Sequence, residues 1–514
     1  MYSDLIRFCR IFGVLRTFAR YDSLFLLGRM GISKSYITFL KIVLAAPTKR
    51  GLTSNRPGER LSLALTTLGP AFIKLGQALS VRPDLLGAEI AKDLRKLQDK
   101  VPAFDGKIAM AIVENELGKP VNELFSYFEE SATAAASVAQ VHRAKTLDGK
   151  NIAVKILRPD IENVFARDLD ITLKIAEYLQ ACRPSLKRLK PVETVKTLIK
   201  SFEIEMDLRL EAAAAAEMKE NFIEDHRFNI PAVDWNLTSQ RILTTAWIEA
   251  TSISELTTKQ LTNIPAERLV KKLAEIFFLQ IFRDGFFHAD LHPGNIFIDN
   301  CGNIHLIDFG IMGRLDLETR IFLAEMLHGF LTANYKKVAE VHAQAGFLPR
   351  RTSTAEFAQA IRSITEPILG LPSSKISLSQ LLNQLFSITK KFNMQTQPQL
   401  LLLQKTMLVA EGVGRKLAPE VNMWKLAEPL MENWLKQRMD AEEHVKHTAK
   451  TIYKSLERLP STLRTIEDAV ENWENNNNLE YQLKERPAKY SFSLFWVISW
   501  LICVIGIVYF CLPL

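Results

Sequence analysis

The chain has 514 residues, too many for one ordinary hydrophobic core, so we expect two or more structural units. Hydrophobic residues make up 47% of it, which argues against intrinsic disorder. The net charge of +8 suits a membrane surface or a phosphate-bearing ligand. We expect no nucleic-acid partner, because the sequence contains neither a zinc finger nor an aromatic–basic platform. Five scattered cysteines without a C-x-x-C pair indicate a reducing compartment and no structural zinc.

Residues 1–125 form the first predicted unit, a helical N-terminal extension, because apolar residues and lysines recur there at helical spacing. Its start is arginine-rich and amphipathic but has no continuous apolar core before a cleavage site, so it is not a secretory signal. A helix on a membrane surface, a docking helix and an organellar transit peptide all stay open for this start. Further along, Pro70 is well placed to open a helix. On that helix Lys74 and Gln77 would point to one side, and Gly76 would let another backbone come close.

Within the predicted N-lobe, residues 126–160 contain short strand-like runs, with a turn at Asp148–Gly149. The second run, "NIAVKIL", places Lys155 among apolar neighbours, like the strand lysine that binds nucleotide phosphates in kinases. The alternative for Lys155 is a surface lysine at a strand edge. A kinase needs a phosphate-covering loop before this lysine, but no G-x-G-x-x-G is present.

An alanine-rich segment stands in that position instead. Alanine approaches a phosphate almost as closely as glycine does, yet it cannot adopt positive φ cheaply, so this loop should be stiffer and present fewer N–H groups. The run could also be a helix, but Ser137, Val138 and Val141 favour a turn entering a strand. The predicted nucleotide contacts are Ala132, Thr133, Ala134, Ala135, Ala136, Ser137, Val138, Ala139 and Gln140.

The acidic segment "FEIEMDLRLEAAAAAE", residues 202–217, carries two conflicting patterns. Its apolar residues alternate as in a strand, but the alanines favour a helix, which we predict. Asp207 and Glu211 would then share a face, with Glu205 roughly opposite. Glu211 is the candidate partner of Lys155, since kinases pair their strand lysine with a helix glutamate. Glu205 and Asp207 would meet Lys74 or a metal, and both options stay open, as does a solvated acidic face.

The stretch "HADLHPGN", residues 288–295, and "DFG", residues 308–310, carry the strongest functional signal. Asp290 and Asn295 are five positions apart and Asp308 follows thirteen positions later, the arrangement that protein kinases use. Asp290 would orient the nucleophile, while Asn295 and Asp308 supply the hard oxygen ligands that Mg²⁺ needs beside ATP. The two histidines at i, i+4 could suggest zinc, but the following Pro-Gly interrupts a helix and no H-E-x-x-H is present. A bare turn would not account for the DFG at kinase spacing.

Taken together, these motifs resemble the UbiB family of atypical kinase-like proteins over roughly residues 60 to 320. The marks of that family stand here as Lys74-Leu-Gly-Gln77, "AAAS" at 134–137, Lys155, Glu205-Met-Asp207, "HADLHPGN" and "DFG". The resemblance implies an α+β, bilobal protein-kinase-like fold. It also implies that the Lys74–Gln77 element packs across the nucleotide cleft, where a protein kinase would seat a peptide. A small or lipid substrate, or hydrolysis of ATP itself, is then favoured over a protein substrate.

The predicted organisation is the extension at 1–125, an N-lobe at 126–250, a C-lobe at 251–360, a helical C-terminal region at 361–480 and a transmembrane anchor at 490–514. The segment Ser491–Leu514 contains no charge, and at about 1.5 Å per residue it would cross a hydrocarbon core of roughly 30 Å. Basic residues precede it, which predicts a single-pass anchor with the bulk of the chain in the cytoplasm. A buried core helix is the alternative. The family often carries two short tail helices, whereas this tail has room for one.

Two hypotheses for function follow. The first is a membrane-anchored, ATP- and Mg²⁺-dependent kinase or ATPase that supports ubiquinone biosynthesis at a bacterial inner membrane. Its expected partners are membrane lipid, a small molecule or prenylated quinone precursor, and enzymes of ubiquinone biosynthesis. The second is a nucleotide-binding scaffold that presents prenylated precursors without phosphoryl transfer. Direct hydroxylation of a quinone ring finds no support, because neither a dinucleotide-binding motif nor an iron-ligand triad is evident.

Overall fold

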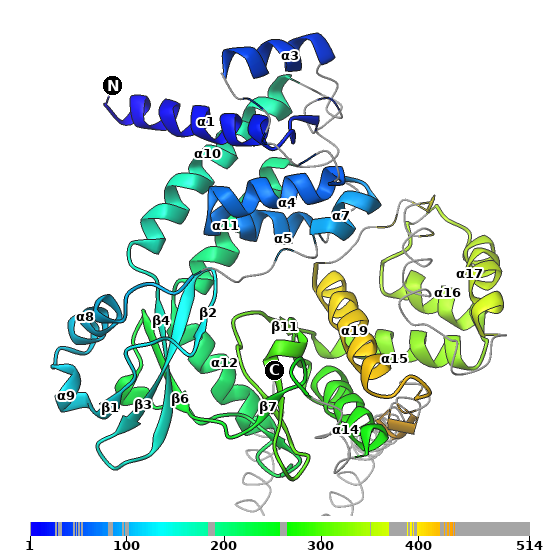
Figure 1. Ribbon diagram of the computed structural model, residues 1–514. Coiled ribbons are helices and arrows are strands. Elements are labelled where there is room, and N and C mark those ends of the chain that lie inside the picture. Colours follow the sequence, from blue (N-terminus) through cyan, green and yellow to red (C-terminus); the bar gives the residue numbers. More distant parts are fainter. Residues whose placement is uncertain are drawn as a thin grey trace, which may run out of the picture. The chain divides into compact units, whose positions relative to one another are not determined.

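The computed structural model describes residues 2–436, apart from several gaps, of which the longer ones are 29–32, 81–85, 98–101, 183–190, 257–264, 370–387 and 422–425. Helices and three antiparallel or mixed sheets alternate along this part of the chain, in agreement with the predicted α+β class (Figure 1). The predicted anchor at 490–514 lies outside the described residues. Within them, no helix combines the length and the apolar character that crossing a bilayer requires.

A five-stranded antiparallel sheet forms the N-lobe, in the order β1-β3-β4-β6 with β2 paired to β3. Its strands are β1 (Phe125–Phe128), β2 (Ala134–Ala135), β3 (Ala139–Thr146), β4 (Asn151–Leu157) and β6 (Ile242–Ala246). The predicted turn between β3 and β4 is confirmed: Gly149 adopts φ +82°, and its N–H donates to the Thr146 carbonyl at 2.9 Å. Such a positive φ is what glycine supplies in a tight turn.

Successive side chains of β4 point to opposite faces of the sheet, and this determines which of them can reach the region between the lobes. Ile152, Val154 and Ile156 point to one face, where α8 (Gly106–Leu117) and α9 (Val121–Leu124) cover them. Leu157 points to the other face, against α10 (Ile161–Cys182), α11 (Pro191–Glu205) and α12 (Leu208–Asn221). Lys155 shares that second face. Since α8 and α9 pack on the sheet, they belong to the N-lobe core and not to the extension in which the sequence placed them.

The extension is helical, as predicted, and consists of α1 (Tyr2–Arg20), α3 (Lys34–Val43), α4 (Pro57–Leu68), α5 (Pro70–Ser80) and α7 (Ala88–Leu94). Helices α1, α4, α5 and α7 share a small core. Pro70 opens α5, as its position predicted. Contacts between the extension and the N-lobe include the packing of Ala71 with Val138 and Ala139 and an ion pair of 2.7 Å between Arg10 and the buried Asp168 of α10.

The C-lobe is built around one large apolar core that short strands and long helices share. Its strands are β5 (Phe228–Asn229), β7 (Thr251–Ser252), β8 (Phe286–His288), β9 (Ile296–Ile298), β10 (Ile304–Leu306) and β11 (Met312–Arg314). Its helices are α14 (Ala266–Phe278), the π-helical η3 (Leu279–Asp284), α15 (Leu317–Leu331), α16 (Tyr335–Gln344) and α17 (Thr354–Leu369). Strands β9 and β10 pair antiparallel and form a hairpin around residues 300–303.

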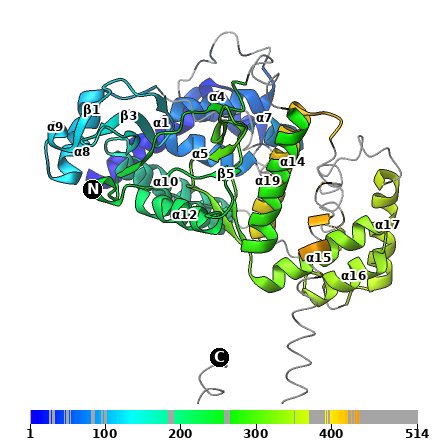
Figure 2. The same cartoon turned by 90° about the horizontal axis from the view of Figure 1, so that it is seen from below.

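One helix of the predicted C-terminal region, α19 (Pro398–Leu417), packs into the C-lobe. It lies along α14 and next to β11 (Figures 1 and 2), and its Leu403 and Val413 are buried in the core of the lobe. This packing places residues far along the chain beside the segment that follows the DFG motif.

Replacing Gly313 by alanine should destabilise the protein, because the added Cβ would lie 2.1 Å from Cζ of Phe287, a ring with no exposed surface. Overpacking of this kind costs about 1–3 kcal/mol of unfolding free energy. Gly412→Ala is the matched control: its Cβ would meet nothing within 4 Å, and alanine favours a helix by about 1 kcal/mol over glycine. Chemical denaturation measures both variants, and equal unfolding free energies would contradict this packing.

Candidate active site

Three charged side chains meet where the lobes adjoin. The Lys155 ammonium, from β4, donates to both carboxylate oxygens of Glu211 at 2.7 and 2.9 Å and to Oδ1 of Asp308 at 3.0 Å. Glu211 stands in the first turn of α12, and Asp308 follows β10. The ion pair predicted between Lys155 and Glu211 is therefore present, and Asp308 joins it as a third member.

The electrostatics of this cluster follow from its partial burial. Burial acts to lower the pKa of the Lys155 ammonium, but the carboxylates of Asp308 and Glu211 outweigh it and raise that pKa. Lys155 in turn holds the pKa of Asp308 well below its usual range. Burial raises the pKa of Glu211 to about 7, although Lys155 opposes the shift. Lys155 and Asp308 are thus firmly charged near neutral pH, and Glu211 is the carboxyl group that can take up a proton.

The backbone at Asp308 is held in an uncommon conformation. Its φ is +62°, the left-handed region that costs most residues energy but that aspartate tolerates better than others. A Cβ added at Gly310 would lie 3.4 Å from Oδ1 of Asp308 and 3.8 Å from Oε2 of Glu211, so the DFG glycine packs directly on the cluster. Strain concentrated in this way is typical of functional sites.

His288 positions the loop at residues 288–295 from inside the protein and has no exposed surface. Its Nδ1 accepts from the Asp290 N–H at 3.1 Å, so Nε2 carries the hydrogen, which points to the Ile307 carbonyl at 3.3 Å. Burial lowers the pKa of His288, which keeps the ring neutral for this role. The His288 N–H donates to Oε1 of Gln280, a residue of η3. The histidine thus joins the two predicted motifs and is no zinc ligand.

Asn295 closes the loop behind Asp290. Its Nδ2 donates to the Asp290 carbonyl at 3.1 Å, and its own carbonyl accepts from the Ile307 N–H at 3.1 Å. The side-chain oxygen of Asn295 and the carboxylate of Asp308 are hard oxygen donors of the kind that Mg²⁺ prefers. Among the residues that the structure describes, no three His, Cys, Asp or Glu side chains form a metal site by themselves. Two protein ligands completed by phosphate oxygens and water are the usual arrangement for Mg²⁺.

The structure adds Lys405, which the sequence reasoning missed. Its ammonium, from α19, donates to Oδ1 of Asp290 at 2.7 Å. The two residues are 115 positions apart, so no local motif connects them. The sequence did offer one signal: residues 400–410 read "LLLLQKTMLVA", and Lys405 is the single charge in this apolar run. The helix that carries the run packs into the lobe.

Lys74 of α5 reaches the site region from the extension. Its ammonium pairs with Glu205 at 3.1 Å, with both side chains less than one-fifth exposed. The pKa of Asp308 is lowered mainly by Lys155, against the opposing effect of burial, and Lys74 adds to this lowering. The sequence left two partners open for Glu205, Lys74 or a metal, and the structure shows the contact with Lys74.

Asp207 behaves differently from its prediction. It caps α12, accepting from the N–H and the guanidinium of Arg209, so α11 ends at Glu205 and α12 begins at Leu208. The single helix with Asp207 and Glu211 on one face was therefore wrong. A short acidic side chain competes for backbone N–H groups and ends a helix more readily than it continues one.

The Lys74–Gln77 element also differs in detail from expectation. A Cβ at Gly76 would lie 2.5 Å from a methyl of Leu97 and 2.7 Å from one of Leu65, so this glycine admits two leucine side chains of the extension and not a second backbone. Nε2 of Gln77 donates to the Leu97 carbonyl at 3.5 Å. This face of α5 is therefore used to hold the extension together.

The alanine-rich segment forms a hairpin, as Ser137 and Val138 predicted, and the helical alternative is wrong. β2 pairs with β3, and the Ala136 N–H closes the turn on the Ala139 carbonyl at 2.8 Å. Arg158 donates to the Ala136 carbonyl from behind. One N–H group of the turn is therefore used in a hydrogen bond within the turn itself.

The end of that segment turns inward. Gln140 is fully buried, and its side chain bonds the N–H and the carbonyl of Phe104 at 2.9 and 3.3 Å. Val138 and Ala139 pack with Ala71 of α5. The side chains of these three residues therefore hold neighbouring segments. For residues 132–140 the nucleotide contact stays a prediction.

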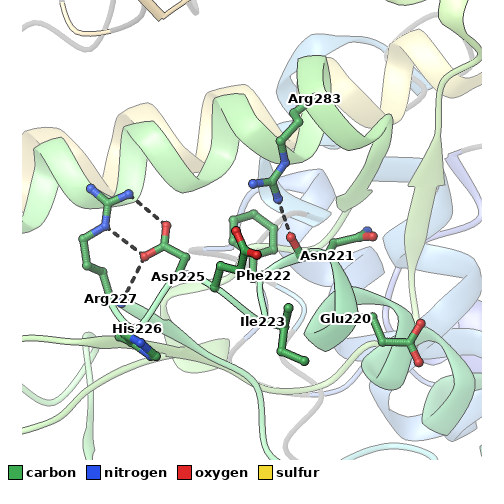
Figure 3. A pocket seen from close by; sticks show the side chains of 9 residues that line it. Glu220, Asn221, Phe222, Ile223, Asp225, His226, Arg227 and Arg283 are labelled. Carbon is green, nitrogen blue, oxygen red and sulfur yellow. Dashed lines mark hydrogen bonds and ion pairs between the residues drawn. The ribbon is translucent and has the colours of Figure 1, made fainter.

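A hollow of 580 Å³ lies elsewhere, at the C-terminal end of α12 (Figure 3). Arg283 packs over the ring of Phe222 there, and Arg227 pairs with Asp225 at 2.8 Å. Glu211 and this hollow lie at opposite ends of α12, about 15 Å apart at the rise of a helix. None of the predicted site residues lines the hollow, so it is separate from the charged cluster.

Comparison with known proteins agrees with the geometry. Residues 96–342 match the model of the ABC1 atypical kinase-like domain, and residues 361–422 match that of the UbiB helical domain. Fold and site thus define an atypical kinase-like protein with mixed helices and sheets.

Individual relatives identify the family within this class of kinase-like proteins. The chain is 41% identical to the "Probable protein kinase UbiB" of Marinobacter nauticus over 80% of this chain and 76% of that protein. It is 38% identical to the protein of the same name from Pseudomonas putida (strain F1) over 93% of this chain and 88% of that protein. A solved structure, that of the Rv3197–erythromycin complex from Mycobacterium tuberculosis, is similar with a TM-score of 0.48 and 25% identity, over 77% of this chain and 98% of that one. This chain belongs to the UbiB family, as its motifs predicted.

Replacing Lys155 by methionine should destabilise the protein more as the pH rises. Without the ammonium, Glu211 and Asp308 repel each other, and the pKa of Glu211 moves further above its unfolded value. When the pKa of a carboxyl group is higher in the folded protein than in the unfolded one, the protein loses stability as the pH rises from the unfolded pKa to the folded pKa. We expect a loss of about 3 kcal/mol in unfolding free energy at about pH 8 and a smaller loss at about pH 6.

The matched control is the double variant Lys155→Met/Glu211→Gln, in which the titrating carboxyl group is gone. Chemical denaturation at both pH values should show a smaller loss for the double variant and little dependence of that loss on pH. A Lys155→Met loss that is equal at both pH values would contradict the proximity of the two carboxylates.

Proposed function

We propose that this protein is an ATP- and Mg²⁺-dependent atypical kinase or ATPase that acts at a membrane in ubiquinone biosynthesis. The observation that carries the proposal is the Lys155 ammonium held between Glu211 and Asp308, beside a loop that presents Asp290 and Asn295. Nucleotide-dependent phosphoryl transfer needs a cation for the phosphates, oxygen ligands for Mg²⁺ and a carboxylate near the nucleophile. All three lie in one region of this protein.

Each residue has a role that follows from its contacts. Lys155, oriented by Glu211, would hold the phosphates of ATP, and Asn295 with Asp308 would hold Mg²⁺. The bound metal would neutralise charge on the phosphates. Asp290, fixed through its backbone by His288 and Asn295, would orient an acceptor hydroxyl or a water and take up its proton. The residues of the alanine-rich hairpin, 132–137, would cover the phosphates.

The substrate is proposed to be small or lipidic. The ion pair between Lys74 and Glu205 and the packing of Ala71 on the sheet attach the extension beside the nucleotide site, where a peptide would otherwise bind. The proposed partners are membrane lipid, a prenylated quinone precursor and enzymes of ubiquinone biosynthesis. The relatives are named probable protein kinases, so the substrate class is where this proposal departs from their printed name. The uncharged segment 490–514 is the proposed single-pass anchor in a bacterial inner membrane.

A second candidate is a nucleotide-binding scaffold that presents prenylated precursors without transferring a phosphoryl group. One observation favours it: the alanine-rich turn closes on itself through the Ala136 N–H, which leaves fewer donors for phosphate than a glycine-rich loop offers. The oxygen ligands and the carboxylate required for transfer are nevertheless intact, and they favour the enzyme.

Phosphate release from Mg-ATP by the full-length protein in lipid nanodiscs distinguishes the two candidates. We expect turnover that falls at least about 100-fold in Asp290→Asn, because the carboxylate that accepts the proton is lost. We expect a similar fall in Asp308→Asn, through lost metal binding. Asp225→Asn, in the separate hollow at the end of α12, is the matched control and should keep full turnover. Background release that is the same in the unsubstituted protein and in Asp290→Asn would support the scaffold.

A further inference from the structure

The contact between Lys405 and Asp290 joins the C-terminal helix to the reaction centre. The Lys405 ammonium donates to Oδ1 of Asp290 at 2.7 Å, and both side chains are about one-third exposed, at 36% each. An ion pair this exposed contributes little to the stability of the protein, so stability does not account for its presence. The Lys405 ammonium lies beside the Asp290 carboxylate, which is proposed to take part in the reaction, and this position suggests a role in the reaction itself.

The backbone that carries Lys405 is firmly placed. Leu403 and Val413 of α19 are buried in the C-lobe core, and Thr406, which has no exposed surface, bonds back to the Leu402 carbonyl at 2.9 Å. The helix contacts α14 and β11. Figures 1 and 2 show α19 alongside α14 in both views. The ammonium is therefore delivered from a packed helix, with a direction that the fold determines.

The cations nearest to the reaction have distinct positions. Lys155 is held between Glu211 and Asp308, on the side where the nucleotide phosphates are proposed to bind. Lys74 pairs with Glu205. Within the catalytic loop, Nδ1 of His292 accepts the Gly294 N–H at 3.1 Å, so the ring is used there as an acceptor. Lys405 is the cation whose contact is with Asp290 itself, where the acceptor oxygen would attack.

We infer that Lys405 is a catalytic residue: its ammonium contacts the phosphoryl group while that group passes from ATP to the acceptor held by Asp290. The inference rests on the proposed function and deepens it, because it makes the C-terminal helix a part of the active site. Charge spreads over the oxygens of the transferred group in such reactions, and a fixed ammonium beside the line of transfer stabilises that charge.

The proposed phosphoryl transfer forms one bond to phosphorus and breaks another. The acceptor oxygen, from a hydroxyl or a water, forms a bond to the γ-phosphorus while the bond from that phosphorus to the β–γ bridging oxygen breaks. The bridging oxygen leaves with the electron pair as part of ADP. The acceptor proton passes to the Asp290 carboxylate and from there to solvent. Lys405 keeps its protons throughout and moves its contact from Asp290 to the phosphoryl oxygens as the proton arrives.

The test compares Lys405→Met and Lys405→Arg with Lys416→Met, an exposed lysine on the same helix. Phosphate release by full-length protein in nanodiscs gives kcat and KM, and calorimetry gives the affinity for Mg-ATP. We expect kcat to fall about 100-fold in Lys405→Met, with the Mg-ATP affinity and the unfolding temperature unchanged. Lys405→Arg should recover part of the rate, and Lys416→Met should match the unsubstituted protein.

Chemical rescue provides a readout that a structural role would not move. Lys405→Ala should regain turnover when ethylammonium is added, because the partly exposed site admits a small amine. Equal kcat in Lys405→Met and Lys416→Met, or a loss confined to Mg-ATP affinity, would overturn the role of Lys405 while leaving the proposed function intact. Absence of turnover in the unsubstituted protein would overturn both.

Discussion

A single ammonium between two carboxylates is the interaction on which this structure depends. Lys155 brings β4, α12 and the DFG segment to one point, at distances of 2.7 to 3.0 Å. One positive charge does not balance two negative ones, and burial makes the imbalance costly. The raised pKa of Glu211, about 7, is one sign of that cost. The Mg²⁺ proposed to bind at Asp308 would relieve the rest.

Two elements outside the sheet and the C-lobe strands each bring a lysine toward this centre. The extension supplies Lys74, which pairs with Glu205, and α19 supplies Lys405, which pairs with Asp290. Both elements are anchored by apolar packing, Ala71 on the sheet and Leu403 in the C-lobe core. The chemistry and the boundaries of the site thus depend on segments at opposite ends of the described chain. The proposal of a small or lipid acceptor rests on this arrangement.

The sequence predicted what local patterns and shared chemistry determine. The strand that carries Lys155 follows from a short apolar run after the turn at Asp148–Gly149, and the pairing with Glu211 follows from the demands of nucleotide chemistry. The break at Asp207 was missed because a capping hydrogen bond outweighed the helix propensity of the alanines that follow. The inward turn of Gln140 and the reach of Lys405 were missed because both are tertiary contacts, the second between residues 115 positions apart. The anchor predicted at 490–514 and the roles of the nucleotide-binding residues stay predictions.

The most direct test of the central claim is where Mg-ATP protects the backbone from hydrogen exchange. Mass spectrometry of the full-length protein in nanodiscs, with and without Mg-ATP, should show protection in the hairpin at 131–141, around Lys155, and in the segments 288–295 and 307–310. The same protection should be absent when Mg²⁺ is replaced by a chelator. Protection at the hollow formed by residues 220–227, or no change at the cluster around Lys155, would contradict the account.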